Sequence, residues 1–349
     1  MKIAVLQPKM IGDVLITSVV FEALRVKFPQ AELHYVINKN TMPVVANNPN
    51  IDKFILLEPH DEKILSGLVK QIKQIKKEQY DIIIDSYAKL KTAFFCWFSG
   101  AKTSISFHKS YTNFIYTTTV VRNKISKTIA TKAIEHRMLL LEPLDIPFSI
   151  IKPKIYLTNT EIAQAKNSLE QNGIAVKNPI VMISALGSSD SKTYPLHYMA
   201  KALNEVGKIE NIQILFNYLP NQKPQAEALF KLCNAETQQK IVIDFYAQSL
   251  REFMAITSFC KALIGNEGGA TNMAKALSVP TFTIFSPFIL KNDWNIFEDS
   301  ITNVSVHLSD FENVTINKKS NNSLGFYELF KPELFEDLLT SFLKNNISN

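Results

Sequence analysis

The chain has 349 residues, 46% of them hydrophobic, and a formal net charge of +6 at pH 7. This much apolar sequence excludes a disordered chain, and the length predicts two domains. No apolar run reaches the roughly 18 residues that cross a membrane, and the first residues lead directly into a strand rather than into a secretory signal. We therefore expect a globular protein located in the cytoplasm.

Strand and helix patterns alternate from end to end. In the first half they predict strands at 2–6, 32–37, 54–57 and 81–85 and helices at 14–27, 65–77, 91–98 and 130–144. A link follows at 147–178, with a helical piece at 161–172. In the second half they predict strands at 180–184, 212–216, 240–243, 262–264 and 280–285 and helices at 196–206, 224–233, 250–259 and from 270 onward. The chain ends in a strand and loop at 303–311, a polar loop at 318–323 and a helix at 327–344.

Such alternation, with continuous apolar strands, is typical of parallel sheets covered by helices. We expect an α/β protein with two Rossmann-like domains at residues 1–150 and 151–325, followed by a closing helix at 326–349. Two such domains would face each other across a cleft at the carboxyl ends of their sheets, where α/β proteins bind ligands. The three cysteines are too far apart in sequence to indicate a disulfide framework or a zinc site, and we expect Cys96 and Cys260 in the core.

The most informative motif lies between two apolar strands at 262–264 and 280–285. Gly265 ends the first strand, a Gly268-Gly269 turn follows, and a helix starts near Ala270 and Thr271. The first turn of a helix has unpaired N–H groups and a partial positive charge, so this turn predicts a phosphate site. A tight strand-to-helix turn without a ligand explains the glycines equally well.

In each expected domain, one further loop of interest follows the first strand. Asp13 comes just after the strand at 2–6, where a carboxylate can act as a general base or can cap the helix that follows. The segment from Gly187 to Lys192 is rich in serine and follows the strand at 180–184. It suits a phosphate, although a surface loop would have the same composition. In the second domain this segment and the Gly268-Gly269 turn would lie at the same edge of one sheet, and both offer groups that bind anions. Both would face Asp13 across the cleft, so we favour a functional site.

A basic stretch separates these loops in the sequence. Residues 101–132 contain six lysines and arginines and no acid. This stretch is suited to phosphates or an anionic membrane surface, and a solvated face is the alternative. His108 and His136 are candidates for substrate contact, and the Glu135-His136-Arg137 cluster is a helix cap or a pocket lining. Nucleic acid is not expected, because no recognition motif accompanies the charge.

The sequence lacks the motifs of several enzyme classes. The chain has no G-x-S-x-G elbow, no P-loop and no HExxH sequence. The Gly268-Gly269 pair does not fit G-x-G-x-x-G, which argues against a nicotinamide dehydrogenase.

These motifs together resemble family 9 glycosyltransferases, the heptosyltransferases that build the inner core of lipopolysaccharide. The resemblance covers nearly the whole chain. Its first motif, similar to the family's G-D helix opening, is Ile11-Gly12-Asp13-Val14-Leu15, followed by Ala23-Leu24-Arg25 and Phe28-Pro29. Its second, similar to a lysine followed by an aromatic residue and proline, is Ser191-Lys192-Thr193-Tyr194-Pro195, with Tyr194 where Trp is usual. Its third, the donor loop, is Gly265-Asn266-Glu267-Gly268-Gly269-Ala270-Thr271-Asn272.

The donor loop departs from the family pattern at three positions. Glu267 replaces an aspartate, Gly268 a hydroxyl residue and Asn272 a histidine. The extra glycine leaves more room near the phosphates. The loop after the first strand carries Gln7, Pro8 and Lys9, which changes the expected acceptor contacts.

The resemblance implies a GT-B fold and an inverting, metal-independent glycosyltransferase that needs no cofactor. Its co-substrate would be a nucleotide-diphosphate sugar, ADP-heptose, and its acceptor a phosphorylated or lipid-linked glycan such as the lipopolysaccharide core. Asp13 would be the catalytic base. Donor contacts are expected from Ser188, Lys192, Glu267, Gly268, Gly269, Ala270, Thr271 and Asn272. Acceptor contacts are expected from Lys9, Met10, Lys109 and His136.

We further expect a monomer at the cytoplasmic face of the inner membrane. Residues 246–248, after the expected strand at 240–243, are expected to line the base of the nucleotide. Two alternatives have the same cleft and phosphate loop: a sugar-nucleotide epimerase of GT-B type, and a nucleotide-sugar-binding protein without catalysis.

Overall fold

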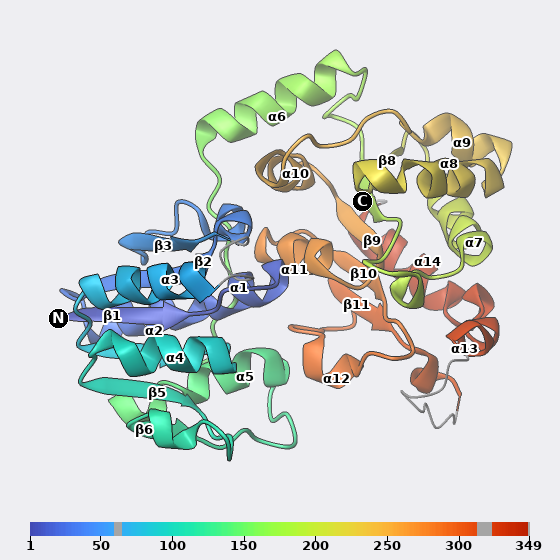
Figure 1. Ribbon diagram of the computed structural model, residues 1–349. Helices are drawn as coiled ribbons and strands as arrows, with labels where there is room; N and C mark the ends of the chain where they lie inside the picture. Colours follow the sequence, from blue (N-terminus) through green and yellow to red (C-terminus); the bar gives the residue numbers. More distant parts are fainter. Residues whose placement is uncertain (59–64, 313–322, 348–349) are drawn as a thin grey trace. The chain divides into compact units, whose positions relative to one another are not determined.

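The computed structural model describes residues 1–58, 65–312 and 323–347 (Figure 1). It divides into two compact units, the N-terminal unit Met1–Tyr156 and the C-terminal unit Leu157–Asn349. The division falls six residues beyond the boundary expected after residue 150, and the last helix belongs to the C-terminal unit.

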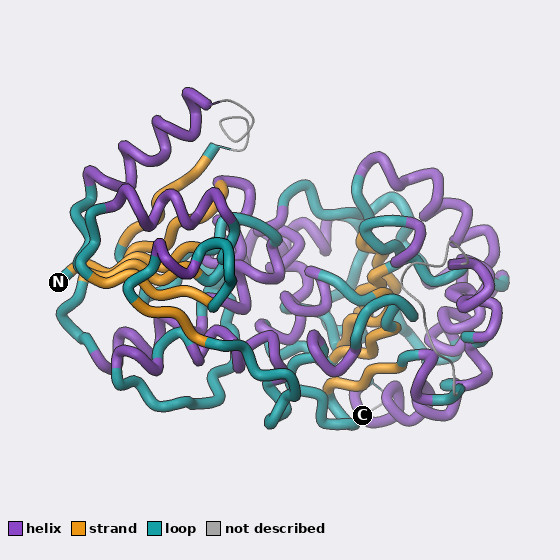
Figure 2. The backbone as a smooth tube through the Cα atoms, turned by 60° about the horizontal axis from the view of Figure 1, so that its bottom comes forward, coloured by secondary structure: helices purple, strands orange, loops and turns teal. Residues whose placement is uncertain are grey.

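The N-terminal unit is built on a six-stranded sheet in the order β3-β2-β1-β4-β5-β6, with every neighbouring pair parallel. The strands, orange in Figure 2, are β1 Lys2–Leu6, β2 Glu32–Asn38, β3 Lys53–Leu57, β4 Ile82–Asp85, β5 Thr103–Phe107 and β6 Thr118–Val120. Parallel strands need crossovers, and helices supply most of them here. The order of the strands reverses between β1 and β4.

Helices cover both faces of this sheet. They are α1 Ile11–Thr17, α2 Val19–Lys27, α3 Leu65–Lys77, α4 Leu90–Ser99 and α5 Thr131–Leu139, with short 3₁₀ turns at η1 Lys39–Val45, η3 Asn113–Ile115 and η4 Glu142–Leu144. Ile75 of α3 and Phe95 of α4 pack with Val36 in one apolar cluster. Successive strand residues face opposite ways, so Tyr35 lies on the other face, where its ring is 4.8 Å from that of Phe21 in α2.

The C-terminal unit has a five-stranded parallel sheet in the order β11-β10-β9-β7-β8. Its strands are β7 Ile180–Ser184, β8 Gln213–Asn217, β9 Ala262–Asn266, β10 Thr281–Ile284 and β11 Asn303–Val306. Its helices are α6 Asn159–Gln171, α7 Leu196–Gly207, α8 Lys223–Leu232, α9 Ala235–Lys240, α10 Leu250–Thr257, α11 Gly269–Ala276, α12 Lys291–Trp294, α13 Ser323–Leu329 and α14 Glu336–Asn346. Short 3₁₀ turns occur at η5 Asp190–Lys192, η6 Pro220–Gln222, η7 Leu308–Asp310 and η8 Pro332–Leu334.

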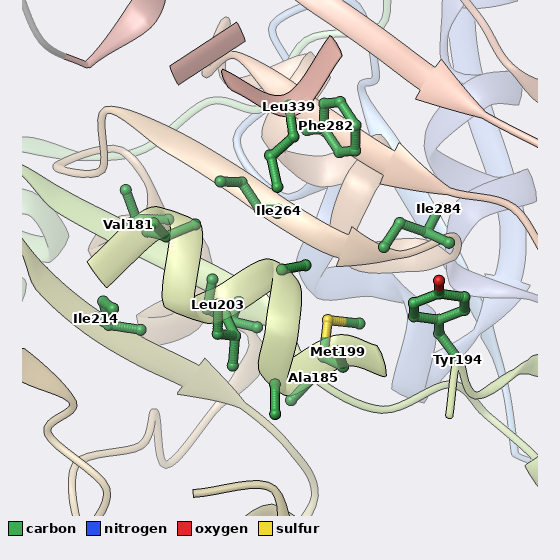
Figure 3. Close-up of a cluster of buried hydrophobic side chains, with 14 of the residues drawn as sticks. Val181, Ala185, Tyr194, Met199, Leu203, Ile214, Ile264, Phe282, Ile284 and Leu339 are labelled. Atoms are coloured by element: carbon green, nitrogen blue, oxygen red, sulfur yellow. The ribbon is translucent and has the colours of Figure 1, made fainter. Parts of the chain in front are cut away.

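One large apolar cluster forms the core of this unit on one face of the sheet. Figure 3 shows part of it, where Val181, Ile264 and Phe282 from three strands lie with Leu203 of α7 and Leu339 of α14. The cluster explains how α14 is anchored, because this helix contributes buried apolar residues to the same core as the strands.

Most expected elements are confirmed, but the expected strand at 240–243 is wrong. The helix α9 runs up to Lys240, and Ile241 makes only an isolated bridge to Ile214. Asn234 caps that helix by accepting a hydrogen bond from the Thr237 amide, a signal that the apolar run after it obscured. Residues 246–248 therefore do not follow a strand.

Three expected helices are interrupted, and the one at 130–144 ends as an α-helix at Leu139, before the 3₁₀ turn η4. The helix at 14–27 is divided at Ser18, whose hydroxyl donates to the Leu15 carbonyl at 2.7 Å, a local bond that competes with the helix. The closing helix at 327–344 is divided around Pro332, which cannot donate to a helical bond. The short strands β5 and β6 were missed, because threonine and serine interrupt their apolar pattern. The expected polar loop at 318–323 lies, apart from its last residue, outside the described residues.

Candidate active site

In each sheet the predicted site residues lie where the strand order reverses. Ligands of open α/β sheets bind outside the carboxyl ends of the strands at this point. In the N-terminal unit the reversal lies between β1 and β4, and Asp13 follows β1 in the first turn of α1. In the C-terminal unit it lies between β7 and β9, and the loops after these strands carry Lys192 and Gly268.

Asp13 is held by a buried arginine from another helix. Arg137 of α5 donates from Nη2 to Asp13 Oδ1 at 2.6 Å and from Nε to Thr17 Oγ1 at 2.8 Å. A further bond from Nη1 to the Ala133 carbonyl fixes the guanidinium within its own helix. The helix-cap alternative for Asp13 is wrong, because Met10 holds the cap position of α1 and Asp13 bonds to Arg137 instead.

The carboxylate of Asp13 is fixed in direction but remains accessible. Its side chain is 21% exposed, and within the described residues only Oδ1 accepts a hydrogen bond. Tyr35 stabilises α1 by donating from its hydroxyl to the Val14 carbonyl at 2.8 Å. Burial raises the pKa of Tyr35, so its hydroxyl remains a neutral donor. A fixed carboxylate with one oxygen available can accept a proton from a bound hydroxyl group.

The Glu135-His136-Arg137 cluster has three separate tasks. Burial acts to raise the pKa of Glu135, but hydrogen bonds from the Lys127 and Thr128 amides hold that pKa below its ordinary value. The same bonds fix the loop that contains Lys127 and Thr128. His136 lies 3.1 Å from the Asn123 carbonyl through Nε2. Burial lowers the pKa of His136, so the ring is neutral at pH 7 and Nε2 carries the donated hydrogen. The third residue, Arg137, orients Asp13.

The other acceptor candidates lie around the same end of the unit. Lys9 is half-buried, and its carbonyl accepts a hydrogen bond from the Gln7 side chain. Met10 is 67% exposed and has a φ of 66°, a backbone conformation that few side chains tolerate. Lys109 donates from Nζ to the Ala88 carbonyl.

Asn266 joins the two loops of the C-terminal unit. Its Oδ1 accepts from the Tyr194 amide at 2.7 Å, and its Nδ2 donates to the carbonyls of Ser184 and Ala185 at 2.9 Å each. The residue is 1% exposed, so these bonds are protected from water. Beside it, a Cβ on Gly265 would lie 2.4 Å from the Ser184 carbonyl oxygen, and this glycine is therefore required for strand packing.

The loop after β7 is folded back on itself. Thr193 Oγ1 accepts from the Gly187 amide at 3.0 Å and donates to the Ser189 carbonyl at 2.9 Å. The Ser191 carbonyl accepts from the hydroxyl of Ser286 at 2.8 Å and from that of Tyr327 at 3.0 Å. These bonds fix the backbone, while the Ser188 side chain at the tip of the loop is exposed.

Lys192 and Glu267 bring opposite charges together from the two loops. The Lys192 Nζ lies 3.9 Å from Glu267 Oε1, at the outer limit of an ion pair. The Glu267 side chain is 13% exposed, and its Oε1 is buried without a hydrogen bond. Burial raises the pKa of Glu267, and the nearby Lys192 ammonium opposes this effect. The pair is therefore loose and can accept a further polar group.

The start of α11 is open in the way that an anion site requires. Gly268 occupies the cap position with a φ of 154°, and no side chain caps the helix. A Cβ built on Gly268 would have no atom within 4 Å apart from its chain neighbours, so this cap position is not crowded by other parts of the described chain. The helix continues through Gly269, Ala270 and Thr271, and Asn272 is half-buried on the same turn.

Two supporting residues were missed as functional by sequence reasoning. Arg137 was noted only as part of a cluster, since nothing in the sequence relates it to Asp13, 124 positions away. Asn266 was quoted in a motif without a task, although an asparagine that ends a buried apolar strand requires polar partners. That requirement is the signal that could have identified it.

The described residues contain no helix long and apolar enough to cross a membrane. They also hold no group of three or more histidine, cysteine, aspartate or glutamate side chains placed to bind a metal ion. Cys96, Cys233 and Cys260 are free thiols and buried, and Cys96 and Cys260 lie in the core as expected.

Comparisons with known proteins agree on the family. The model of glycosyltransferase family 9 (heptosyltransferase) matches residues 68–323. Lipopolysaccharide heptosyltransferase 1 of Campylobacter coli is 22% identical over 296 residues, which cover 82% of this chain and 84% of that protein. Lipooligosaccharide heptosyltransferase 2 of Haemophilus influenzae is 20% identical over 293 residues, with coverage of 82% and 84%.

Solved structures show the same fold. A family 9 glycosyltransferase from Veillonella parvula matches with a TM-score of 0.80 and 18% identity, over 97% of each chain. The ADP-heptose lipopolysaccharide heptosyltransferase II of E. coli matches with a TM-score of 0.69 and 14% identity, over 97% of this chain and 99% of that one. The expected α/β fold of GT-B type, with two parallel sheets, is confirmed. This chain belongs to glycosyltransferase family 9 and is a glycosyltransferase of the heptosyltransferase type.

Proposed function

We propose that this enzyme transfers heptose from ADP-heptose to a lipopolysaccharide core or a related envelope glycan, by an inverting mechanism that uses neither a metal ion nor a cofactor. The observation that carries the proposal is the joined pair of loops in the C-terminal unit. They present an ammonium group and an uncapped helix start at one point of the sheet edge. A nucleotide diphosphate has the charge that this arrangement lacks.

The donor diphosphate would bind in front of α11. Gly269, Ala270 and Thr271 supply the first three amides of α11, which have no partner within the helix, and the open Gly268 position lets a phosphate approach them. Lys192 would leave its loose contact with Glu267 for the phosphate. Glu267 and Asn272 would then bind donor hydroxyl groups, with Ser188 at the entrance of the site.

Asp13 would activate the acceptor. As the acceptor oxygen attacks the anomeric carbon, its proton passes to Asp13 Oδ2, while the bond from that carbon to the diphosphate oxygen breaks. ADP leaves with the bonding electrons, and Lys192 and the α11 amides stabilise its charge. Attack opposite to the leaving group inverts the anomeric configuration. Arg137 stays bonded to Oδ1 throughout and keeps Oδ2 directed at the acceptor.

The acceptor contacts would come from the N-terminal unit. His136, held neutral by burial and with its hydrogen on Nε2, can accept a hydrogen bond through Nδ1 but brings no charge of its own. Lys9 and Lys109 would attract acidic groups of the glycan, and Met10 would contact its apolar part. The proposal also places a monomeric enzyme at the cytoplasmic face of the inner membrane.

The direct test is product analysis with ADP-heptose and lipopolysaccharide that lacks its heptoses. We expect heptosylated product and free ADP only when both substrates are present, with equal rates in EDTA. A changed sugar formed from donor alone would instead indicate an epimerase. Donor binding without turnover, with every acceptor, would indicate a binding protein.

The configuration of the new bond tests the mechanism separately. We expect the product to carry the anomeric configuration opposite to that of the donor, measured by NMR. Retention would contradict a single displacement assisted by Asp13.

A further inference from the structure

We propose that an exposed aromatic patch on the N-terminal unit inserts into the interface of an anionic lipid bilayer. The patch consists of Phe94, Trp97 and Phe98 from α4 and Phe114 from η3. The inference deepens the proposed function, because it assigns a surface to the membrane contact that a lipid-linked acceptor would require.

The four rings form a continuous group. Trp97 and Phe98 stack with centroids 6.2 Å apart, Phe94 and Phe98 stack at 6.5 Å, and Trp97 meets Phe114 edge-on at 5.7 Å. Trp97 is 53% exposed, Phe98 50% and Phe114 70%. Single exposed apolar residues are ordinary, but aromatic rings gathered on two elements indicate an interaction surface.

The core of the unit does not explain these rings. On α4, Ala93, Phe95 and Cys96 pack into the cluster beneath the helix. Phe94, Trp97 and Phe98 lie on the remaining side, where a helix on the surface of a globular protein normally carries polar residues. The helix α4 is labelled in Figure 1, and the apolar side chains on this side of it do not belong to the core cluster.

The charge of the sequence segment that contains the patch selects the partner. From Ser86 to Ile134 the sequence has no aspartate or glutamate. It has eight basic residues there, namely Lys89, Lys91, Lys102, Lys109, Arg122, Lys124, Lys127 and Lys132. Aromatic rings favour the headgroup level of a bilayer, and each nearby cation adds attraction to anionic lipids. A second copy of the chain is disfavoured, because a symmetric contact would bring two acid-free basic segments together.

The two tryptophans of the chain make the test specific. Trp97 lies in the patch, and Trp294, which is 45% exposed, lies in the C-terminal unit. Trp294→Phe leaves Trp97 as the only indole reporter, and Trp97→Phe leaves Trp294. With vesicles of phosphatidylglycerol and phosphatidylcholine, we expect a blue shift of fluorescence from the first variant and none from the second. Vesicles of phosphatidylcholine alone should give a much smaller shift, as should 0.5 M salt.

A matched pair of double variants measures the affinity. Trp97→Ser with Phe114→Ser should weaken sedimentation with anionic vesicles at least tenfold, whereas Trp294→Ser with Leu290→Ser should leave it unchanged. All four residues are at least 45% exposed, so both variants should fold, which circular dichroism checks. Equal sedimentation of the two variants would overturn the proposal. So would a blue shift of Trp97 that depends on protein concentration without vesicles, because it would identify a second copy.

Transfer to a water-soluble acceptor fragment separates this inference from the proposed function. The patch variant should retain that activity. Absence of vesicle binding with full activity would overturn the membrane surface alone, whereas vesicle binding without any transfer would overturn the proposed function alone.

Discussion

The two sheet edges that carry the candidate site residues are stabilised in opposite ways. In the N-terminal unit a charged pair does the positioning: Arg137 holds Asp13 at 2.6 Å, across 124 residues of sequence. In the C-terminal unit a neutral amide does it: Asn266, at the end of β9, binds backbone groups at the end of β7 and in the loop that follows β7. The charged groups there, Lys192 and Glu267, are left 3.9 Å apart.

The difference follows from what each edge is proposed to do. A base must present one oxygen in a fixed direction, and a charge-assisted bond to its other oxygen provides this. A diphosphate site needs positive groups that are not already neutralised, so the protein fixes its loops through uncharged bonds. The comparison predicts that variants at the edge of the N-terminal sheet change the rate of transfer. Variants at the edge of the C-terminal sheet should change the stability of the protein or its affinity for the donor.

The largest effect is expected at the base. Asp13→Ala should lower the rate of transfer about 10²- to 10⁴-fold, the usual contribution of a general base. Asp13→Asn should do the same, although it keeps the size of the side chain and can still accept from Arg137. Rates under saturating donor and acceptor measure this. Turnover near that of the parent enzyme in either variant would remove Asp13 from the mechanism.

Loss of the amide clamp should be the next largest effect. Asn266→Ala leaves the Tyr194 amide and the carbonyls of Ser184 and Ala185 buried without these partners. Since each such group costs about 1–3 kcal/mol, we expect the free energy of unfolding to fall by about 3 kcal/mol. Denaturation in urea measures it. Asn272→Ala, half-buried and outside the clamp, serves as the control, and equal stability of the two variants would contradict the clamp.

Arg137, at the sheet edge of the N-terminal unit, should affect the rate of transfer without affecting the binding of the donor. Arg137→Ala should lower kcat about 10- to 100-fold through misdirection of Asp13, with an unchanged KM for the donor. Arg137→Lys keeps a charge but lacks the separate Nε and Nη2 donors that bond Thr17 and Asp13, so it should restore only part of the rate. An equal loss in kcat and donor affinity would show that Arg137 does more than position the base.

The smallest effect is a dependence of stability on pH at Glu267. Its pKa is raised in the folded protein, chiefly by burial. The folded state thus holds this proton to higher pH than the unfolded state does, so stability is lost as pH rises from the ordinary pKa of 4.5 through the raised value. Glu267→Gln should raise Tm above that window and leave Tm nearly unchanged below it. A gain in Tm that is equal at all pH values would refute the burial of a charge.

Much of this arrangement could be predicted from sequence, and the parts that could not share a cause. The strands β1, β7 and β9, and with them the loops that follow, are continuous apolar runs with clear ends. The contacts of Arg137 and Asn266 connect segments distant in sequence, so no local pattern reports them. The segment at 240–243 is a local failure, because an apolar run after a helix was mistaken for a strand.

In the proposed mechanism the N-terminal edge supplies the base and the C-terminal edge binds the donor. This division is tested most directly by measuring donor affinity and transfer on the same preparations of two variants, Asp13→Ala and Lys192→Ala. Lys201→Ala, a lysine paired with Glu333 on the surface of the C-terminal unit, is the control. We predict that Asp13→Ala abolishes transfer with an unchanged Kd for ADP-heptose, and that Lys192→Ala raises this Kd about tenfold, the loss of one charge-assisted contact of about 1.4 kcal/mol. A weakened Kd in Asp13→Ala, together with an unchanged Kd in Lys192→Ala, would contradict the account.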